Sequence, residues 1–413
     1  MRKVHLLTLL AVLALVISGA GAALARRQAT LTLMGWSSST AENDALMAQV
    51  EAFMAANPDI KVNVNLVPEY DTTIQAAFAA GDPPNVFYVD SSRLPDWAEA
   101  GVLASGEGKI ENLEEHYESL LEAFTYNGTL YCPPKDFSIM ALQYNKDMFD
   151  AAGLEYPTPD WTWDDLRAAA EALTGTDAEG RTVLGLVTPP NFERWLPFLY
   201  QADGSVLNED WTEVTLDSDE AREALEFYVG MVRDGIAGPP SAVDAGWGGE
   251  AFGQRRVAMA MEGNWVIKYL LDQFPDLNWG VTELPRYPDG GQATMVFTVC
   301  YGVAADNDYP DESWKLANFL TGPEGSLMVA EEGFGVIPPA KSVADTWLQA
   351  IGEEYGAGFL AGAPYAHKWQ FPVGFGEVFD TFNSGLQLAF GGQALPEDVI
   401  VDTAAVAEEV LAR

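Results

Sequence analysis

The first third of the chain alternates between segments with the apolar period of a strand and segments with that of a helix. Residues 30–34 (TLTLM) and 60–66 (IKVNVNL) alternate apolar and polar positions as half-buried strands do, and residues 86–89 form a third short apolar run. Between these runs, residues 43–56 and 72–80 repeat apolar side chains roughly every three to four positions, which predicts amphipathic helices. This order predicts a mostly parallel sheet built from βαβ units.

The rest of the chain mixes strands and helices without a low-complexity linker. Asn127-Gly128 predicts a tight hairpin, because both residues tolerate the positive φ angles of a type I′ turn. Further strands are expected at residues 138–144, 183–187, 257–262, 279–283 and 295–305. Further helices are expected at residues 163–173, 218–233, 264–274, 310–320, 322–332, 376–390 and 396–411. Since no flexible linker is present, two domains would have to be joined by short extended segments.

The N-terminal segment has the features of an export signal. Arg2 and Lys3 precede an apolar run at residues 6–17, and residues 23–25 (ALA) fit the cleavage pattern of small residues. The run is shorter than the about 20 residues of a membrane-spanning helix, although an uncleaved anchor is the alternative. Both cysteines lie far from this segment, so no lipid-attachment cysteine is expected. We therefore expect residues 1–25 to be a signal peptide and the mature protein to be periplasmic or extracellular.

Composition indicates a globular protein with an acidic surface. The chain is 48% hydrophobic and 11% aromatic, and a mature chain of nearly 390 residues exceeds one ordinary core, which predicts two domains. The net charge of −39 becomes −41 when the cations of the signal segment are removed. Such a surface repels nucleic acid and anionic membranes and disfavours strongly anionic ligands at long range. A surface suited to solubility or high salt is the simplest explanation.

The chain lacks the short motifs of common catalytic and cofactor sites. It contains no phosphate-binding loop, dinucleotide-binding fingerprint or serine nucleophile elbow. His116 and His367 are the histidines of the mature chain, and they form no metal-ligand pattern. With 61 Asp and Glu residues, a pair of catalytic carboxylates would be unspecific, so an exported carbohydrate hydrolase stays an alternative. We expect no enzyme activity, no cofactor and no metal.

Aromatic and polar residues gather at predicted strand ends and in loops, where parallel sheets bind ligands. Sugars offer apolar faces that stack on Trp and Tyr, and hydroxyl groups that bind Asp, Asn and Ser. The candidates for ligand contact are Trp36, Ser37, Asp90, Ser91, Asp136, Trp247, Asn264, Trp265, Tyr301 and Trp369. A place in the core is the alternative for each Trp, and it is our expectation for Trp161, Trp195, Trp279 and Trp314. Ordinary solvated carboxylates are the alternative for Asp90 and Asp136.

Several phrases resemble the family-1 extracellular solute-binding proteins, the group that contains maltose-binding protein. Together they extend over nearly the whole mature chain in the order of the family. The most specific are residues 144–146 (YNK) and 261–265 (MEGNW). The longer phrases are residues 76–90 (AAFAAGDPPNVFYVD), 130–154 (LYCPPKDFSIMALQYNKDMFDAAGL), 161–173 (WTWDDLRAAAEAL), 252–265 (FGQRRVAMAMEGNW) and 314–339 (WKLANFLTGPEGSLMVAEEGFGVIPP).

The resemblance implies an α/β fold of the two-lobed periplasmic-binding-protein kind, type II, with a ligand cleft between lobes that close by hinge motion. It implies three hinge crossings, near residues 135–138, 298–302 and 336–339. One lobe would then comprise residues 26–135 and 302–338, and the other residues 136–301 and 339–413.

In function, the resemblance implies a monomeric solute-binding component of an ABC importer, which delivers its ligand to permease subunits in the membrane. A sugar or oligosaccharide is the expected ligand. Members of the family differ in ligand, so a non-sugar solute such as a glycerol phosphodiester is the alternative.

The resemblance also bears on the two cysteines, Cys132 and Cys300. It places both in extended segments at neighbouring lobe crossings, where Cα atoms come within the about 4.4–6.8 Å of a disulfide. Export supplies an oxidising environment. We expect a disulfide beside the hinge, and two buried thiols that never meet are the alternative.

Overall fold

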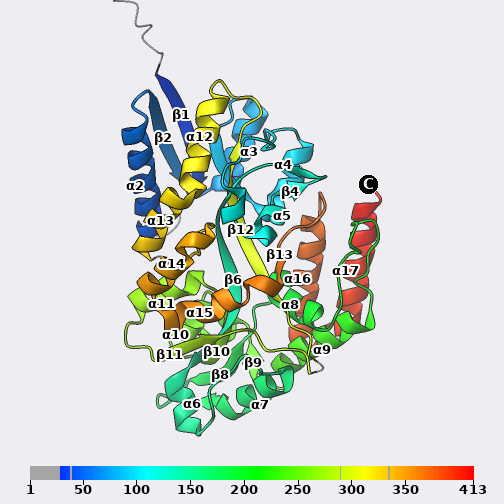
Figure 1. The fold of residues 1–413 in the computed structure, drawn as a ribbon. Coiled ribbons are helices and arrows are strands. Elements are labelled where there is room, and N and C mark those ends of the chain that lie inside the picture. Colours follow the sequence, from blue (N-terminus) through cyan, green and yellow to red (C-terminus); the bar gives the residue numbers. More distant parts are fainter. Residues whose placement is uncertain (1–27, 38–39, 289, 334) are drawn as a thin grey trace, which may run out of the picture.

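The computed structural model describes residues 28–37, 40–288, 290–333 and 335–413. They form two lobes, one above the other in Figure 1, and the long strands β6 and β12 run from one lobe into the other. The predicted signal segment, residues 1–25, lies outside the described residues. None of the helices in the described ranges is long and apolar enough to span a bilayer.

The upper lobe contains the predicted parallel sheet. Strand β1 (Ala29–Trp36) pairs in parallel with β2 (Ile60–Val67) along its whole length and also with β3 (Val86–Asp90), which confirms the βαβ prediction. Its helices and its short hairpin are α2 (Thr40–Ala56), α3 (Tyr70–Ala80), α4 (Leu94–Glu99), α5 (Glu118–Ala123), α12 (Pro310–Thr321), α13 (Pro323–Glu332), β4 (Thr125–Tyr126) and β5 (Thr129–Leu130).

Two local predictions in this lobe are confirmed in detail. Asn127 and Gly128 have φ angles of 50° and 76° and join β4 to β5, as the hairpin prediction requires. Helix α3 ends at residue 80, as predicted, because Gly81 follows with a φ of 68°, a left-handed conformation that glycine adopts without steric cost.

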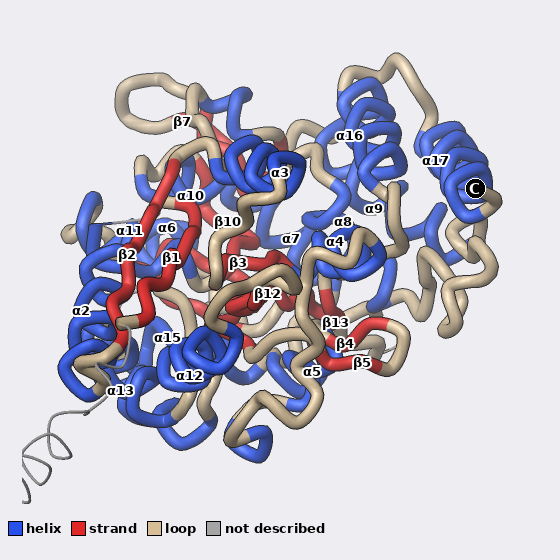
Figure 2. The backbone as a smooth tube through the Cα atoms, turned by 90° about the horizontal axis from the view of Figure 1, so that it is seen from above, coloured by secondary structure: helices blue, strands red, loops and turns tan. Residues whose placement is uncertain are grey.

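The lower lobe is built around β6 (Pro134–Asn145), which carries a core on each face. Its remaining strands are β7 (Gly175–Thr176), β8 (Thr182–Val187), β9 (Ala237–Gly238), β10 (Val257–Gly263), β11 (Trp279–Thr282), β12 (Thr294–Val303) and β13 (Ala366–Lys368). Its helices are α6 (Lys146–Ala152), α7 (Trp163–Leu173), α8 (Phe192–Gln201), α9 (Asp219–Arg233), α10 (Gly248–Gly253), α11 (Trp265–Gln273), α14 (Ala344–Ile351), α15 (Glu353–Ala361), α16 (Gly376–Phe390) and α17 (Pro396–Leu411). Figure 2 shows α16 and α17 side by side at one edge of the molecule.

The two faces of β6 are buried by different helices, because successive side chains of a strand point in opposite directions. Met140, Leu142 and Tyr144 belong to one core with α7, α8, α9, α16 and α17. Ile139 and Ala141 belong to a second core with α10, α11, α14 and α15. A third core, the upper core, contains residues from 29–132 and from 299–320.

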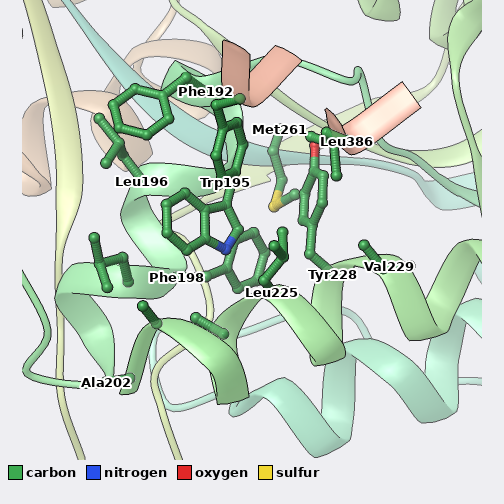
Figure 3. Close-up of a cluster of buried hydrophobic side chains, with 14 of the residues drawn as sticks. Phe192, Trp195, Leu196, Phe198, Ala202, Leu225, Tyr228, Val229, Met261 and Leu386 are labelled. Carbon is green, nitrogen blue, oxygen red and sulfur yellow. The ribbon is translucent and has the colours of Figure 1, made fainter. Parts of the chain in front are cut away.

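The tryptophans expected in cores are largely found there. Trp195, Trp279 and Trp314 are buried, and Trp161 is half-buried at the edge of its core. Figure 3 shows Trp195 packed among side chains of α8 and α9. Helix α8 itself was not expected, because Pro197 lies inside it and proline disfavours helix interiors. Burial of its apolar face overrides that local preference.

The three extended segments expected at the hinge lie side by side. β6 and β12 pair antiparallel, with Phe137 opposite Thr298. Phe137 also exchanges two backbone hydrogen bonds with Ile337, with N···O distances of 3.0 and 2.9 Å. Beside them, Cys132 and Cys300 are joined by a disulfide with a Cα–Cα distance of 5.7 Å, and both are fully buried. The connection between the lobes is therefore a small sheet and not a loose linker.

Candidate ligand-binding site

One pocket, the Trp36 pocket, lies at the carboxyl ends of β1 and β3 and has a volume of about 460 Å³. Trp36 is half-buried there and packs edge-to-face on Tyr70 and Tyr88, with ring centroids 5.5 and 5.0 Å away. The ring of Tyr88 fills the space where a side chain at residue 35 would stand, so Gly35 is required before Trp36. The lining residues are Trp36, Pro68, Glu69, Tyr70, Asp71, Thr72, Asp90, Ser92, Arg93 and Trp369.

Asp90 gives this pocket a fixed hydrogen-bond acceptor. Its Oδ1 accepts hydrogen bonds from the backbone N of Ser92, at 2.9 Å, and from the Ser92 hydroxyl. Burial raises the pKa of Asp90 above its ordinary value, while the bonds from Ser92 oppose that rise. The bonds from Ser92 both go to Oδ1, which leaves Oδ2 to accept a hydrogen bond from a ligand hydroxyl.

The second pocket, the Trp247 pocket, lies in the lower lobe and has a volume of about 570 Å³. It lies at the carboxyl ends of the parallel strands β8, β9 and β10, which is where open α/β sheets bind ligands. The lining residues are Pro189, Pro190, Asn191, Glu193, Arg194, Pro239, Pro240, Ser241, Ala245, Gly246, Trp247, Gly248, Glu262, Gln387 and Phe390.

A charged cluster forms one wall of the Trp247 pocket. Arg194 Nη2 and Glu262 Oε2 are 2.9 Å apart, and Trp265 Nε1 donates to the same oxygen at 3.2 Å. The Arg194 guanidinium lies 5.3 Å from the centre of the Trp265 ring. Burial raises the pKa of Glu262, and Arg194 opposes that rise. The three side chains therefore form one bonded unit.

Three glycines make room for this wall. The indole of Trp265 covers Gly263, and the indole of Trp247 covers Gly249, so that neither position has room for a Cβ atom. Glu262 Oε1 approaches Gly248 equally closely. In the sequence, this close packing is signalled by the motif Trp247-Gly248-Gly249, in which two glycines directly follow a large ring.

A row of aromatic rings connects the two pockets across the hinge strand β12. Phe297 on β12 lies edge-to-face against Trp265, with centroids 5.6 Å apart, and 6.1 Å from Trp369. Trp369 lines the Trp36 pocket, and its carbonyl accepts a hydrogen bond from the hydroxyl of buried Ser91 at 2.8 Å. A chain of ring contacts thus runs from the Trp36 pocket to Trp265, which is bonded to the Arg194–Glu262 pair of the Trp247 pocket.

Some candidates lie elsewhere. Asn264 is fully buried, and its amide bonds the main chain of Ile139 at 2.7 Å and of Gly335 at 2.6 Å. It fastens two segments near the hinge, so its polar atoms are already bonded within the protein. Ser37 is exposed at the end of β1, where its hydroxyl accepts a hydrogen bond from Asn43 at 3.2 Å.

Asp136 and Tyr301 lie behind the Trp36 pocket in a buried cluster with Lys135. Lys135 Nζ pairs with Asp136 and with Glu42, the latter at 3.0 Å, and lies 5.0 Å from the centre of the Tyr88 ring. The side chains of Lys135 and Asp136 are each 8% exposed. Asp136 is therefore neither a solvated carboxylate nor part of an open pocket wall. Among the described residues, no group of three His, Cys, Asp or Glu side chains is arranged to hold a metal ion.

Similarity to known proteins extends over most of the chain. The sequence profile of the bacterial extracellular solute-binding proteins matches residues 48–355. The chain belongs to this family. The relationship predicted from residues 76–90 and the other phrases is thereby confirmed.

Individual relatives of this solute-binding protein match along most of its length. A binding protein of Brucella abortus (strain 2308) is 26% identical over 370 residues, which covers 87% of this chain and 88% of that protein. An ABC substrate-binding protein from Listeria monocytogenes, solved in complex with cycloalternan, has a TM-score of 0.82 and 29% identity over 93% of this chain and 99% of that one. A solute-binding protein from Thermotoga lettingae, bound to α-D-tagatose, has a TM-score of 0.78 and 25% identity over 93% of this chain and 100% of that one. The two-lobed fold expected from the sequence is confirmed.

Proposed function

We propose that this protein is the solute-binding component of an ABC importer and that it binds a sugar or oligosaccharide between its lobes. The observation that carries the proposal is the pair of tryptophan-lined pockets, one in each lobe, joined by an aromatic row at the hinge. Rings of this kind stack on the apolar faces of sugars, and Asp90 accepts from their hydroxyl groups. The saccharides bound by the Listeria and Thermotoga relatives support this choice.

The mechanism we propose needs no chemical step. The ligand docks on one wall, the lobes close, and a membrane permease recognises the closed form. A permease distinguishes loaded from empty protein only through different affinities for the two states, so closure carries the signal. We propose that the protein is exported after loss of residues 1–25, acts as a monomer, and divides into lobes of residues 26–135 with 302–338 and residues 136–301 with 339–413.

A thermal-shift screen of mono- and oligosaccharides tests the proposal. A ligand that binds only the folded state stabilises it by RT ln(1 + [L]/Kd), about 2.7 kcal/mol at 100 times Kd. We expect at least one saccharide to raise the melting temperature and to be recovered unchanged. Stabilisation by glycerol phosphodiesters with no response to any saccharide would contradict the sugar assignment, and recovery of cleaved saccharide would contradict a pure binding role.

Replacing Trp265 with alanine is expected to weaken saccharide binding by about tenfold or more, equivalent to about 1.4 kcal/mol, because Trp265 positions Arg194 and Glu262, which line the Trp247 pocket. The ring also holds Glu262 and Phe297, so a moderate loss of unliganded stability is expected as well. Titration calorimetry of folded protein separates the two effects.

Trp211→Ala is the matched control, because Trp211 is also half-buried but lies outside both pockets, against Lys368. It should leave the affinity unchanged. Equal affinities of Trp265→Ala and the wild type would remove Trp265 from the site.

A further inference from the structure

The Trp247 pocket has a single cationic side chain among its lining residues, Arg194, and that cation is already paired. Its partner Glu262 is 2% exposed, and Arg194 is 16% exposed. Glu193 lines the same pocket, but Arg194 forms its ion pair with Glu262. The fixed charge that a ligand meets on this wall is therefore not a free cation but a neutralised pair.

The pair is held rigidly. Oε2 of Glu262 accepts from both Arg194 and Trp265, and Oε1 rests against Gly248. The backbone N of Glu262 donates to Gln143 Oε1 at 2.9 Å, which fixes the residue at its base. Glu262 is therefore fixed both at its backbone and at the carboxylate oxygen that faces the guanidinium.

We propose that Glu262 determines the charge selectivity of the site: by occupying Arg194 it makes the site accept uncharged polyhydroxy ligands and reject anionic ones, such as uronates and phosphodiesters. This inference rests on the proposed function and narrows it to one ligand class.

The physical reason is the cost of an unpaired buried charge. An anionic ligand could bind Arg194 only by displacing Glu262, which would leave a buried carboxylate without a cation. The opposite wall offers little compensation, because Arg93 lies 3.5 Å from Asp71 and shares its pocket with Glu69 and Asp90. A neutral ligand does not have to displace Glu262. Its hydroxyl groups can donate to the carboxylates and accept from the guanidinium hydrogens that Glu262 does not use.

The test compares matched sugars on three proteins by titration calorimetry at physiological salt, which screens the long-range field of the acidic surface. The probes are glucose with glucuronate, galactose with galacturonate, cellobiose with cellobiouronate, and glycerophosphoglycerol. The proteins are the wild type, Glu262→Gln and Glu193→Gln. The last variant removes the same unit charge from the same pocket but leaves Arg194 paired.

The wild type should bind a neutral sugar at least about tenfold more tightly than its uronate. Glu262→Gln frees Arg194, so the relative affinity for the uronate should rise by about tenfold or more, whereas Glu193→Gln should change it by less than about threefold. A gain of affinity for an anion cannot result from a damaged fold. If Glu262→Gln does not fold, a wild-type ratio near one still overturns the inference.

Binding of a uronate within threefold of its neutral partner by the wild type would overturn the inference and leave the proposed function intact. Equal shifts in the two variants would overturn it too, since net charge and not the pair would then set selectivity. Binding of glycerophosphoglycerol without any saccharide would overturn both the inference and the proposed function.

Discussion

Replacing Lys135 with methionine is expected to lower the free energy of unfolding by about 3–5 kcal/mol, the usual cost of removing one partner from a buried ion pair. Lys135 lies between Glu42 and Asp136, and its side chain is 8% exposed. Methionine keeps much of the volume but removes the cation that pairs with the buried carboxylate of Asp136. Chemical denaturation at neutral pH measures the loss.

The loss should shrink as the pH falls. Burial already raises the pKa of Asp136, and Lys135 is the largest opposing influence. Without Lys135, the pKa of Asp136 in the folded variant lies further above the ordinary carboxyl value of about 4. At pH values between these two pKa values, the folded variant binds more protons than the unfolded chain. Stability of the variant therefore falls as pH rises through that window, and the difference from the wild type is smaller near its acidic end than at neutrality.

Lys109→Met is the control for this prediction. Lys109 Nζ lies 3.2 Å from Asp311, but the two side chains are 48% and 84% exposed. Water already solvates both charges, so a loss below about 1 kcal/mol is expected. Similar losses for Lys109→Met and Lys135→Met, or a Lys135→Met loss independent of pH, would show that burial of the cluster is not what makes Lys135 important.

Reduction of the disulfide is expected to cost about 5 kcal/mol of unfolding free energy in the loop-entropy model, because the bond closes a loop between residues 168 positions apart. The double variant Cys132→Ala, Cys300→Ala should show the same loss without reductant. Denaturant unfolding with and without reductant measures it. Thiol titration of the unreduced, denatured protein should find no free thiol.

The double variant is also the control for side effects of the reductant. Its stability should not change when reductant is added. Two free thiols in the unreduced wild type would refute the bond. A reductant effect of equal size on wild type and double variant would refute its contribution to stability.

Elements with local signals could be predicted from the sequence. Helix α7 has the predicted bounds because Thr162 and Asp165 form a capping box at its start, a feature contained within four residues. The hairpin at Asn127-Gly128 has the same local origin. Helices α8, α14 and α15 were missed for local reasons: α8 contains Pro197 and α15 contains Gly356 and Gly358, which disfavour a helix, and α14 has only eight residues.

The site was predicted only in part. Four of the candidates, Trp36, Asp90, Trp247 and Trp369, line the two pockets, and their role in ligand contact stays a prediction. Arg194 and Glu262 were missed, because nothing local connects residues 68 positions apart. Asn264 has the residue type of a ligand contact, but its bonds to Ile139 and Gly335 depend on segments brought together only by the fold.

The composition of the upper core has a consequence for the order of folding. That core takes side chains from residues 29–132 and from residues 299–320, so it cannot close until most of the chain has been synthesised. Pairings of such large sequence separation form slowly, because the entropy cost of closing a long loop precedes the stabilising contacts. Strands β1, β2 and β3 can pair within residues 29–90, but β3 gains its second neighbour β12, and Cys132 gains its partner Cys300, only after about 300 residues have been synthesised.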